Sequence, residues 1–199
     1  RGVFMVRTDI LEKLKIITTE EQDIINGEKQ INREIYMSGR DNTINSKKLL
    51  DEGKIITMRK HTRFIDFPEH SHDYVELIYM CQGSTTHIIE GKEIKLSEGE
   101  LLFLGQGIHH SIKRADENDI AVNFIVLPHF FSDILYAIGE KESPLKRFFI
   151  NCLCGSESNS YLHYNVSDVT EVQNFMENLI LIVMGDALNK RKQLQMTMA

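Results

Sequence analysis

The feature that most constrains the fold is a run of seven short β-rich segments between residues 54 and 127. Turn segments that contain glycine or charged residues, such as Glu90-Gly91-Lys92, separate most of them. The segments span 54–60, 74–81, 84–89, 93–96, 101–104, 109–113 and 120–127. Short strands at regular spacing with hairpin turns are typical of an all-β sandwich or barrel. The sequence therefore predicts one β-barrel over residues 54–127.

The region before the barrel, residues 1–53, has a different pattern. Ile10, Leu11, Leu14 and Ile17 have helical spacing, and the polar stretch 37–51 follows as a loop with a short helical turn at 46–50. This amount of apolar sequence does not indicate a second core. We expect residues 1–53 to form an N-terminal arm.

The region after the barrel, residues 128–199, favours helices. An apolar stripe over 128–138 ends at Gly139, and a later helix is predicted to begin near Ser167 and Asp168, both good N-cap residues. The stripe of that later helix consists of Val169, Val172, Met176, Leu179, Ile180 and Val183. Periodicity leaves open whether this stripe packs on its own barrel or on a second subunit.

Composition narrows the classes of partner. The chain has 199 residues and a net charge of −6, so it lacks the surplus of positive charge that dominates affinity for nucleic acid. No stretch approaches the ~20 apolar residues of a membrane-spanning helix, and no signal peptide is evident. Three cysteines, an odd number, indicate reduced thiols rather than a disulfide framework. We expect a cytoplasmic protein without a membrane partner.

The stretch HSHDYVE, residues 70–76, concentrates candidate ligands. If it is a β-strand, His70, His72, Tyr74 and Glu76 point to the same side of a sheet, because side chains in a strand alternate. In the segment GIHHSI, residues 107–112, the same alternation directs His110 inward with its apolar neighbours and His109 outward.

Three imidazoles and one carboxylate, from His70, His72, His110 and Glu76, would form a mixed nitrogen and oxygen site inside a small barrel. Such a set suits one divalent ion of zinc, iron, manganese or nickel and leaves coordination positions open for water or another ligand. The sequence does not decide whether these side chains hold a metal ion, contact an organic ligand directly or are only hydrogen-bonded parts of the barrel.

Two motifs give this set a family context. The pattern HSH-x3-E-x6-G over residues 70–83 resembles the first signature of the cupin superfamily, and G-x5-GQG-x2-H over residues 99–110 resembles the second. Gly105 stands where the family usually has proline. The resemblance implies a cupin-type barrel of two facing sheets, also called a jelly roll or double-stranded β-helix. It also implies that His70, His72, Glu76 and His110 occupy the four metal-ligand positions.

A longer stretch, FPEHSHDYVELIYMCQGSTTHIIEGKEIKLSEGELLFLGQGIHHSI, resembles the N-terminal effector-binding and dimerisation domain of AraC-type transcription regulators. The likeness covers about residues 55–195. It implies a small-molecule effector, a sugar or another polar metabolite, bound in the barrel, and a homodimer formed through the helical segment 128–199. It further implies that DNA is read by a C-terminal helix-turn-helix unit outside this chain.

Several roles remain alternatives. Tyr74 and Phe103 are candidate pocket residues beside the four ligands, although aromatic residues in strands often serve only packing. His87 is expected to be a solvated or hydrogen-bonded strand residue, and the remaining histidines outside the motifs, His61, His129 and His163, are expected to be structural. A sensory domain of a regulator, with no catalytic residue, is the favoured function. The alternative is a metal-dependent cupin enzyme, a dioxygenase or isomerase.

Overall fold

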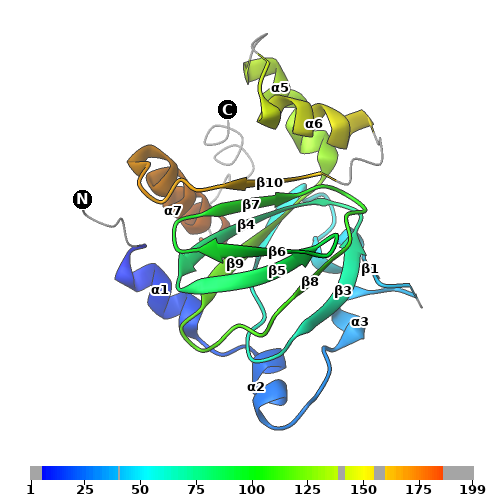
Figure 1. The fold of residues 1–199 in the computed structure, drawn as a ribbon, viewed down its shortest axis with the longest axis vertical. Coiled ribbons are helices and arrows are strands. Elements are labelled where there is room, and N and C mark those ends of the chain that lie inside the picture. Colours follow the sequence, from blue (N-terminus) through cyan, green and yellow to red (C-terminus); the bar gives the residue numbers. More distant parts are fainter. Residues whose placement is uncertain (1–5, 40, 139–141, 155–159, 186–199) are drawn as a thin grey trace.

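The computed structural model describes residues 6–39, 41–138, 142–154 and 160–185. Two five-stranded sheets face each other (Figure 1). One sheet has the order β1 (Thr43–Ile44), β3 (Phe67–His72), β8 (His110–Ile112), β5 (Ser84–Ile89) and β6 (Lys92–Ser97). The other has the order β10 (Tyr161–Tyr164), β7 (Leu101–Leu104), β4 (Val75–Gln82), β9 (Ile120–Val126) and β2 (Ile56–Lys60). The predicted cupin-type fold is confirmed.

Each of the seven predicted β segments contains a strand, with ends displaced by no more than two residues. One expectation was wrong in detail. The stretch HSHDYVE is not a single strand, because β3 ends at His72 and β4 begins at Val75, and the two strands lie in different sheets. Strands β1 and β10, at the sheet edges, were not predicted.

The space between the two sheets is divided into two parts. Alternate residues of β4, β7 and β9 point inward, as the register of Ile78 opposite Leu102 and Asn123 shows. At one end the space is filled by buried apolar side chains: Ile78, Met80, Ile89, Leu96, Leu102, Leu104, Ile108 and Ala121. At the other end, around Phe67, Tyr74 and Ile125, the inner wall also carries histidines and a carboxylate. The candidate site lies at this second end.

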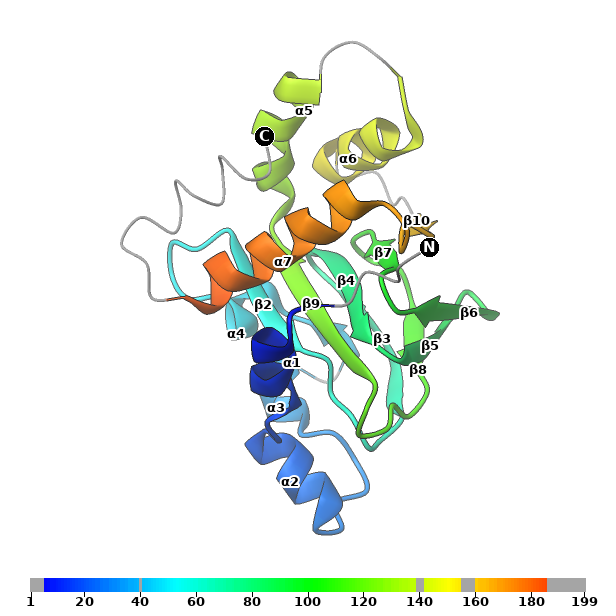
Figure 2. The same cartoon turned by 90° about the vertical axis from the view of Figure 1, so that its left-hand side faces the viewer.

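Helices cover the outer face of the sheet that contains β4 and β9 (Figure 2). They are α1 (Thr8–Lys15), η1 (Pro128–Phe130), α5 (Phe131–Ile138), α6 (Pro144–Cys154) and α7 (Thr170–Met184). In α7, Met176, Leu179 and Ile180 are buried against the barrel of the same chain. The centre of the apolar stripe on α7 therefore packs on its own barrel and not on a second subunit, which periodicity alone could not decide. Leu179 is therefore unsuitable as a probe of dimer contacts.

Some helix boundaries differ from the prediction. Helix α7 begins at Thr170, its N-cap is Val169, and no side chain caps it, so Ser167 and Asp168 do not have the predicted capping role. Helix α6 was not predicted, whereas the turn at 46–50 is confirmed as α4 (Ser46–Leu49). The predicted stop at Gly139 lies outside the described residues.

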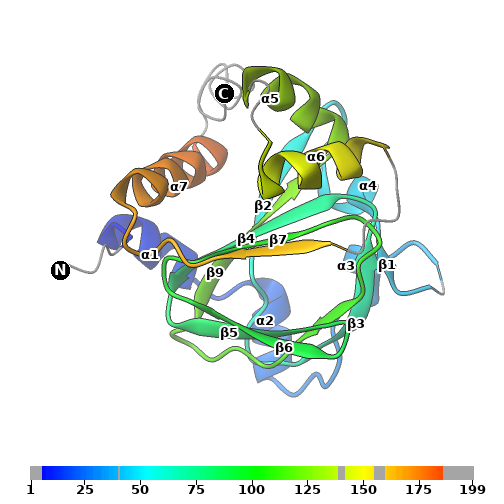
Figure 3. The same cartoon turned by 45° about the horizontal axis from the view of Figure 1, so that its top comes forward.

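The described residues before residue 54, 6–39 and 41–53, contact the barrel on two sides (Figure 3). Helix α1 buries Ile10 and Leu14 in the same cluster as α7, and the Arg7 N–H donates to Glu177 Oε1 of α7 at 2.6 Å. Helices α2 (Thr19–Ile25), α3 (Arg33–Tyr36) and α4, with β1, run along the polar end of the barrel. Tyr36 and Ile44 are buried there with barrel residues. The expected arm thus supplies part of the wall around the candidate site.

Two glycines provide a matched test of backbone strain. Gly99 has φ +80°, and an added Cβ would lie 2.8 Å from Ser167 Cα, whereas Gly91 has φ +76° with open space around it. Gly91→Ala should cost about 1 kcal/mol of unfolding free energy, because only the left-handed backbone is strained. Gly99→Ala should cost about 3 kcal/mol, since strain and steric overlap add. Urea denaturation of both variants checks the difference; equal losses would contradict it.

No helix in the described part of the chain is long and apolar enough to cross a membrane.

Candidate effector and metal site

The corner between β3 and β4 fixes the orientation of two imidazoles. His72 Nδ1 lies 2.7 Å from the Tyr74 carbonyl oxygen, and His70 Nδ1 lies 2.9 Å from the Pro68 carbonyl oxygen. A carbonyl only accepts hydrogen bonds, so each Nδ1 carries the proton and each Nε2 is left with its lone pair. His72 is also stacked on Tyr74, with ring centroids 4.6 Å apart. The His72 Nε2 is buried and has no partner.

Two further groups meet His72 in the barrel. Glu76 lies on β4 in the facing sheet, and His110 begins β8, which is the neighbour of β3 in the same sheet as His72. Glu76 Oε2 lies 3.8 Å from His72 Nε2 and 3.7 Å from His110 Nε2. All three of these atoms are buried and have no hydrogen-bond partner. Buried polar atoms of native proteins are nearly always satisfied, so a convergent unsatisfied group is a candidate ligand site.

The protonation states favour ligand binding over ion pairing. Burial lowers the pKa of His72 to about 3 and that of His70 to about 4, and it lowers the pKa of His110 well below its ordinary value. These imidazoles are neutral at pH 7. Burial raises the pKa of Glu76 to about 7, against the opposing hydrogen bond from Asn123. The close contacts between Glu76 and the two histidines are therefore not ion pairs in the absence of an external ligand.

The three atoms fit a metal ion. In the described part of the chain, His72, Glu76 and His110 are the one group of histidine, cysteine, aspartate or glutamate residues whose ligand atoms all lie within 4.8 Å of one another. Two neutral imidazole nitrogens with one carboxylate oxygen suit zinc or iron and leave open coordination positions. His70 lies beside this group, with its ring 4.1 Å from that of His110, but does not belong to it.

A pocket opens next to this group. Its wall combines Glu76, His70 and Tyr74 with residues from β2, β9 and the segment before residue 54. Its volume is about 420 Å³ when the open mouth is counted, but only about 40 Å³ of it admits water-sized molecules. A water molecule needs roughly 10–15 Å³ on this measure. The pocket therefore accommodates an ion and a few waters, and a metabolite must displace side chains at the mouth.

The structure corrects one predicted pocket residue. Phe103 points to the outer face of its sheet, where it packs on Phe148, Phe149 and Tyr164. Its neighbours Leu102 and Leu104 point inward instead, because side chains alternate along β7. Phe103 therefore has no place in the pocket, whereas Tyr74 lines it as predicted.

The other histidines differ in whether they line the pocket. His109 is exposed and His110 is buried, as predicted. His87 is fully buried and hydrogen-bonded to Thr85 Oγ1, which confirms the hydrogen-bonded alternative. His163 pairs with Glu100 at 2.9 Å, outside the pocket. His61, expected to be merely structural, lines the pocket.

Several pocket residues had no signal in the sequence. Asn123 donates to Glu76 Oε1 at 2.8 Å and accepts from His61 Nδ1 at 3.3 Å. Arg59 and Tyr36 lie at the mouth. None of them is part of a motif. Asn123 could have been found only as the one polar residue of an otherwise apolar strand, and Arg59 had no such signal because β2 also contains Thr57 and Lys60.

A two-sheet β-barrel with neutral imidazoles and one carboxylate at its open end defines a ligand-binding domain of the cupin class. The family model described as the AraC-like ligand binding domain matches residues 52–190. The chain therefore belongs to this family, and the resemblance to AraC-type regulators is confirmed.

Individual relatives agree with this assignment. The HTH-type transcriptional activator RhaS of Mannheimia succiniciproducens is 37% identical over 51 residues, which make up 26% of this chain and 19% of the relative. A solved structure of ToxT from Vibrio cholerae has a TM-score of 0.52 at 12% identity and is matched over 74% of this chain and 54% of that chain. This likeness concerns the fold alone. The chain spans about half of ToxT and a smaller part of RhaS.

Proposed function

We propose that this domain is the sensory part of a transcription regulator and binds a small polar effector, such as a sugar, in the pocket beside His72, Glu76 and His110. The observation that carries the proposal is the convergence of three buried, unsatisfied polar atoms next to a pocket that Glu76 itself lines. Hydrogen-bonding or ligating these atoms removes the cost of leaving them unpaired. Tyr74 and His70 complete the polar wall.

We further propose that His72, Glu76 and His110 hold one divalent ion, of zinc, iron, manganese or nickel, with His70 as a neighbouring fourth candidate. A bound ion would supply open coordination positions for effector oxygen atoms. The protein prepares the ligand atoms, since the Tyr74 carbonyl fixes the proton of His72 on Nδ1 and leaves Nε2 available.

The effector is proposed to act on DNA indirectly. In this proposal the domain forms a homodimer in the cytoplasm and passes its state to a helix-turn-helix unit outside this chain. A ligand changes such an assembly only by binding its arrangements with unequal affinity. Light scattering tests the dimer, and the sequence of the gene beyond the codon for Ala199 tests the DNA-binding unit. A monomer, or a gene without such a unit, would contradict the respective part.

A metal-dependent cupin enzyme is the second candidate function. The same three atoms favour it, because three ligands leave positions for a substrate. The family assignment favours the regulator. Consumption of a bound metabolite by the metal-loaded domain would support the enzyme, whereas recovery of the unchanged metabolite supports sensing.

Two neighbouring leucines allow a direct test of the binding pocket. Leu49 lines the pocket mouth, whereas Leu50, equally half-buried, does not. Leu49→Trp should fill the mouth and weaken effector binding by at least about tenfold, while Leu50→Trp should bind normally. Thermal stabilisation by sugars and other metabolites provides the measurement, because a ligand selective for the native state raises the midpoint. Equal binding by both variants would place the effector elsewhere.

A further inference from the structure

One cation lies at the mouth of the pocket on a rigid element. Arg59 belongs to β2 and is paired in register with Asn123 of β9, whose side chain bonds Glu76. Cross-strand partners point to the same face, so Arg59 is directed into the barrel. Its guanidinium lies over the Tyr36 ring, 4.7 Å from the centroid. The side chain is 30% exposed, which leaves it accessible from the mouth.

The hydrogen-bonding capacity of Arg59 is poorly used. Its Nη2 donates to Tyr36 Oη at 3.3 Å, and the nearest carboxylate oxygen, Glu20 Oε2, lies 3.8 Å away, beyond hydrogen-bond distance. Glu20 Oε1 is buried and has no partner. A guanidinium offers five N–H donors in a planar fork. Arg59 and Glu20 are therefore close in space but incompletely bonded to each other.

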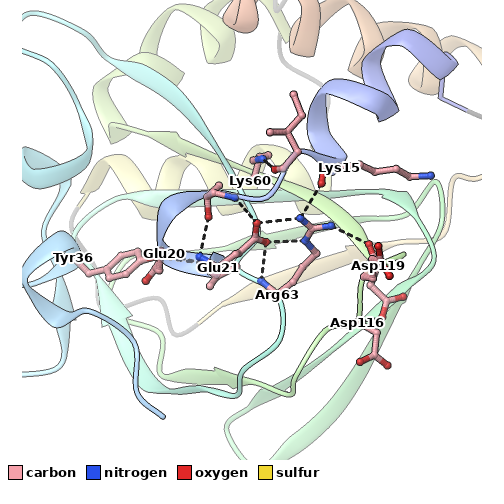
Figure 4. A network of polar contacts seen from close by, with 12 residues as sticks. Lys15, Glu20, Glu21, Tyr36, Lys60, Arg63, Asp116 and Asp119 are labelled. Atoms are coloured by element: carbon pink, nitrogen blue, oxygen red, sulfur yellow. Dashed lines mark hydrogen bonds and ion pairs between the residues drawn. The ribbon is translucent and has the colours of Figure 1, made fainter. Parts of the chain in front are cut away.

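The nearby Arg63, which is buried, shows a guanidinium whose donors are well used (Figure 4). It binds both carboxylate oxygens of Glu21 at 2.7 and 3.0 Å, and also donates to the Lys15 and Glu117 carbonyls. Glu20 and Glu21 are adjacent on α2. The same helix therefore contacts one arginine whose donors have acceptors, Arg63, and one whose donors largely do not, Arg59. The difference marks Arg59 as the residue with donors available for an external anion.

We propose that Arg59 recognises a carboxylate group of the effector, which replaces the loose contact with Glu20. The inference rests on the proposed function and narrows its effector to a polar carboxylate, such as a sugar acid. The Tyr36 and Thr62 hydroxyls, which now contact Glu20, offer two further hydrogen bonds at the same place. The neutral, polar end of the effector would face Glu76 and the imidazoles.

The charges around Arg59 favour a carboxylate over a phosphate. One guanidinium matches the planar, singly charged carboxylate in a bidentate arrangement. Glu20 Oε2 lies 3.8 Å from the guanidinium, and its negative charge opposes a second charge on the ligand. Lys60, the other cation at the mouth, is already engaged with the Ile16 carbonyl.

Matched ligand pairs test the proposal. The ¹⁵N-labelled protein is titrated at constant ionic strength with two carboxylate and neutral pairs, acetate with acetamide and glucuronate with glucose. Glucose 6-phosphate serves as the phosphate for comparison. The Arg59 Nε–H resonance and the thermal midpoint are measured in each titration. A carboxylate should give a saturable shift at Arg59 that its neutral partner does not give. Arg59→Gln should weaken carboxylate binding by at least about tenfold, and Arg59→Lys should restore part of it. Arg114→Gln, an exposed arginine outside the pocket, serves as the matched control.

Glu20→Gln provides an independent arm, because removal of the competing charge should strengthen carboxylate binding several-fold. The proposal is overturned if no carboxylate gives a saturable response at Arg59 of the wild type, or if Arg59→Gln binds carboxylates as well as Arg114→Gln does. Preference for the phosphate also overturns it. If glucuronate binds the wild type no better than glucose does, and Arg59→Gln binds both as the wild type does, the carboxylate inference falls while effector sensing stays intact.

Discussion

His72→Ala is expected to abolish the binding of zinc or nickel by this domain. The substitution removes one of three ligand atoms that lie within 4.8 Å of one another, and two remaining protein ligands do not make a stable site. His110→Ala should have the same effect, because His110 supplies a second imidazole ligand from β8, the neighbour of β3 in the same sheet. Elemental analysis after incubation with the metal and desalting gives the stoichiometry, and calorimetric titration gives the affinity.

The chain contains a close control for this experiment. His109 is exposed and adjacent to His110, so His109→Ala should bind metal like the wild type. His70→Ala should fall between these extremes if His70 turns its Nε2 to the ion, and should equal the wild type if it does not. A wild-type protein that remains free of zinc, iron and nickel after incubation would rule out the ion.

Glu21→Ala should destabilise the domain by about 3–5 kcal/mol, because it leaves Arg63 buried without its counter-ion. Glu21 and Arg63 are 1% and 2% exposed. Arg7 and Asp9 form a comparable ion pair at the surface, where both side chains are more than half exposed. Asp9→Ala should cost less than about 1 kcal/mol. Urea denaturation measures both, and a similar small loss for Glu21→Ala would contradict the assigned importance of the buried pair.

The same pair gives a pH dependence with a defined sign. Burial by itself would raise the pKa of Glu21, but the hydrogen bond and charge of Arg63 and the Thr18 N–H outweigh it and hold the pKa below 4.5. The folded state therefore binds this proton less readily than the unfolded state. The resulting stability is fully present above pH 4.5 and is lost as the pH falls through the lower, folded pKa. Glu21→Ala should reduce the loss of stability in that acid range.

The barrel strands could be predicted because each one shows its own pattern in the sequence, a short β-rich segment between two turns. Residues 84–89 and 101–104 carry β-rich sequence between turns, and the structure places β5 and β7 at these positions. The corner at residues 73 and 74 was not predictable in this way, since alternating polar residues continue through it. The prediction of a single strand over residues 70–76 was wrong, but its consequence, that His72 and Glu76 lie close together, was correct. Two strands in facing sheets present these residues to the same interior.

The candidate site was predictable only where motifs exist. His72, Glu76 and His110 follow from spacing and family resemblance, and the structure brings them together. Arg59 and Tyr36 lie far apart in sequence and meet only because the segment before residue 54 covers the pocket end of the barrel. Their contact depends on tertiary packing, which local periodicity does not encode.

The packing of α1 changes where the folding unit begins. Family similarity starts at residue 52, yet Val6, Ile10 and Leu14 share one buried cluster with α7, and a hydrogen bond joins Arg7 to Glu177. We therefore expect the cooperative unit to extend 46 residues upstream of the family match, from residue 52 to residue 6. We expect the first and last described helices to unfold together, so that the limits of the family match differ from the limits of the stable unit.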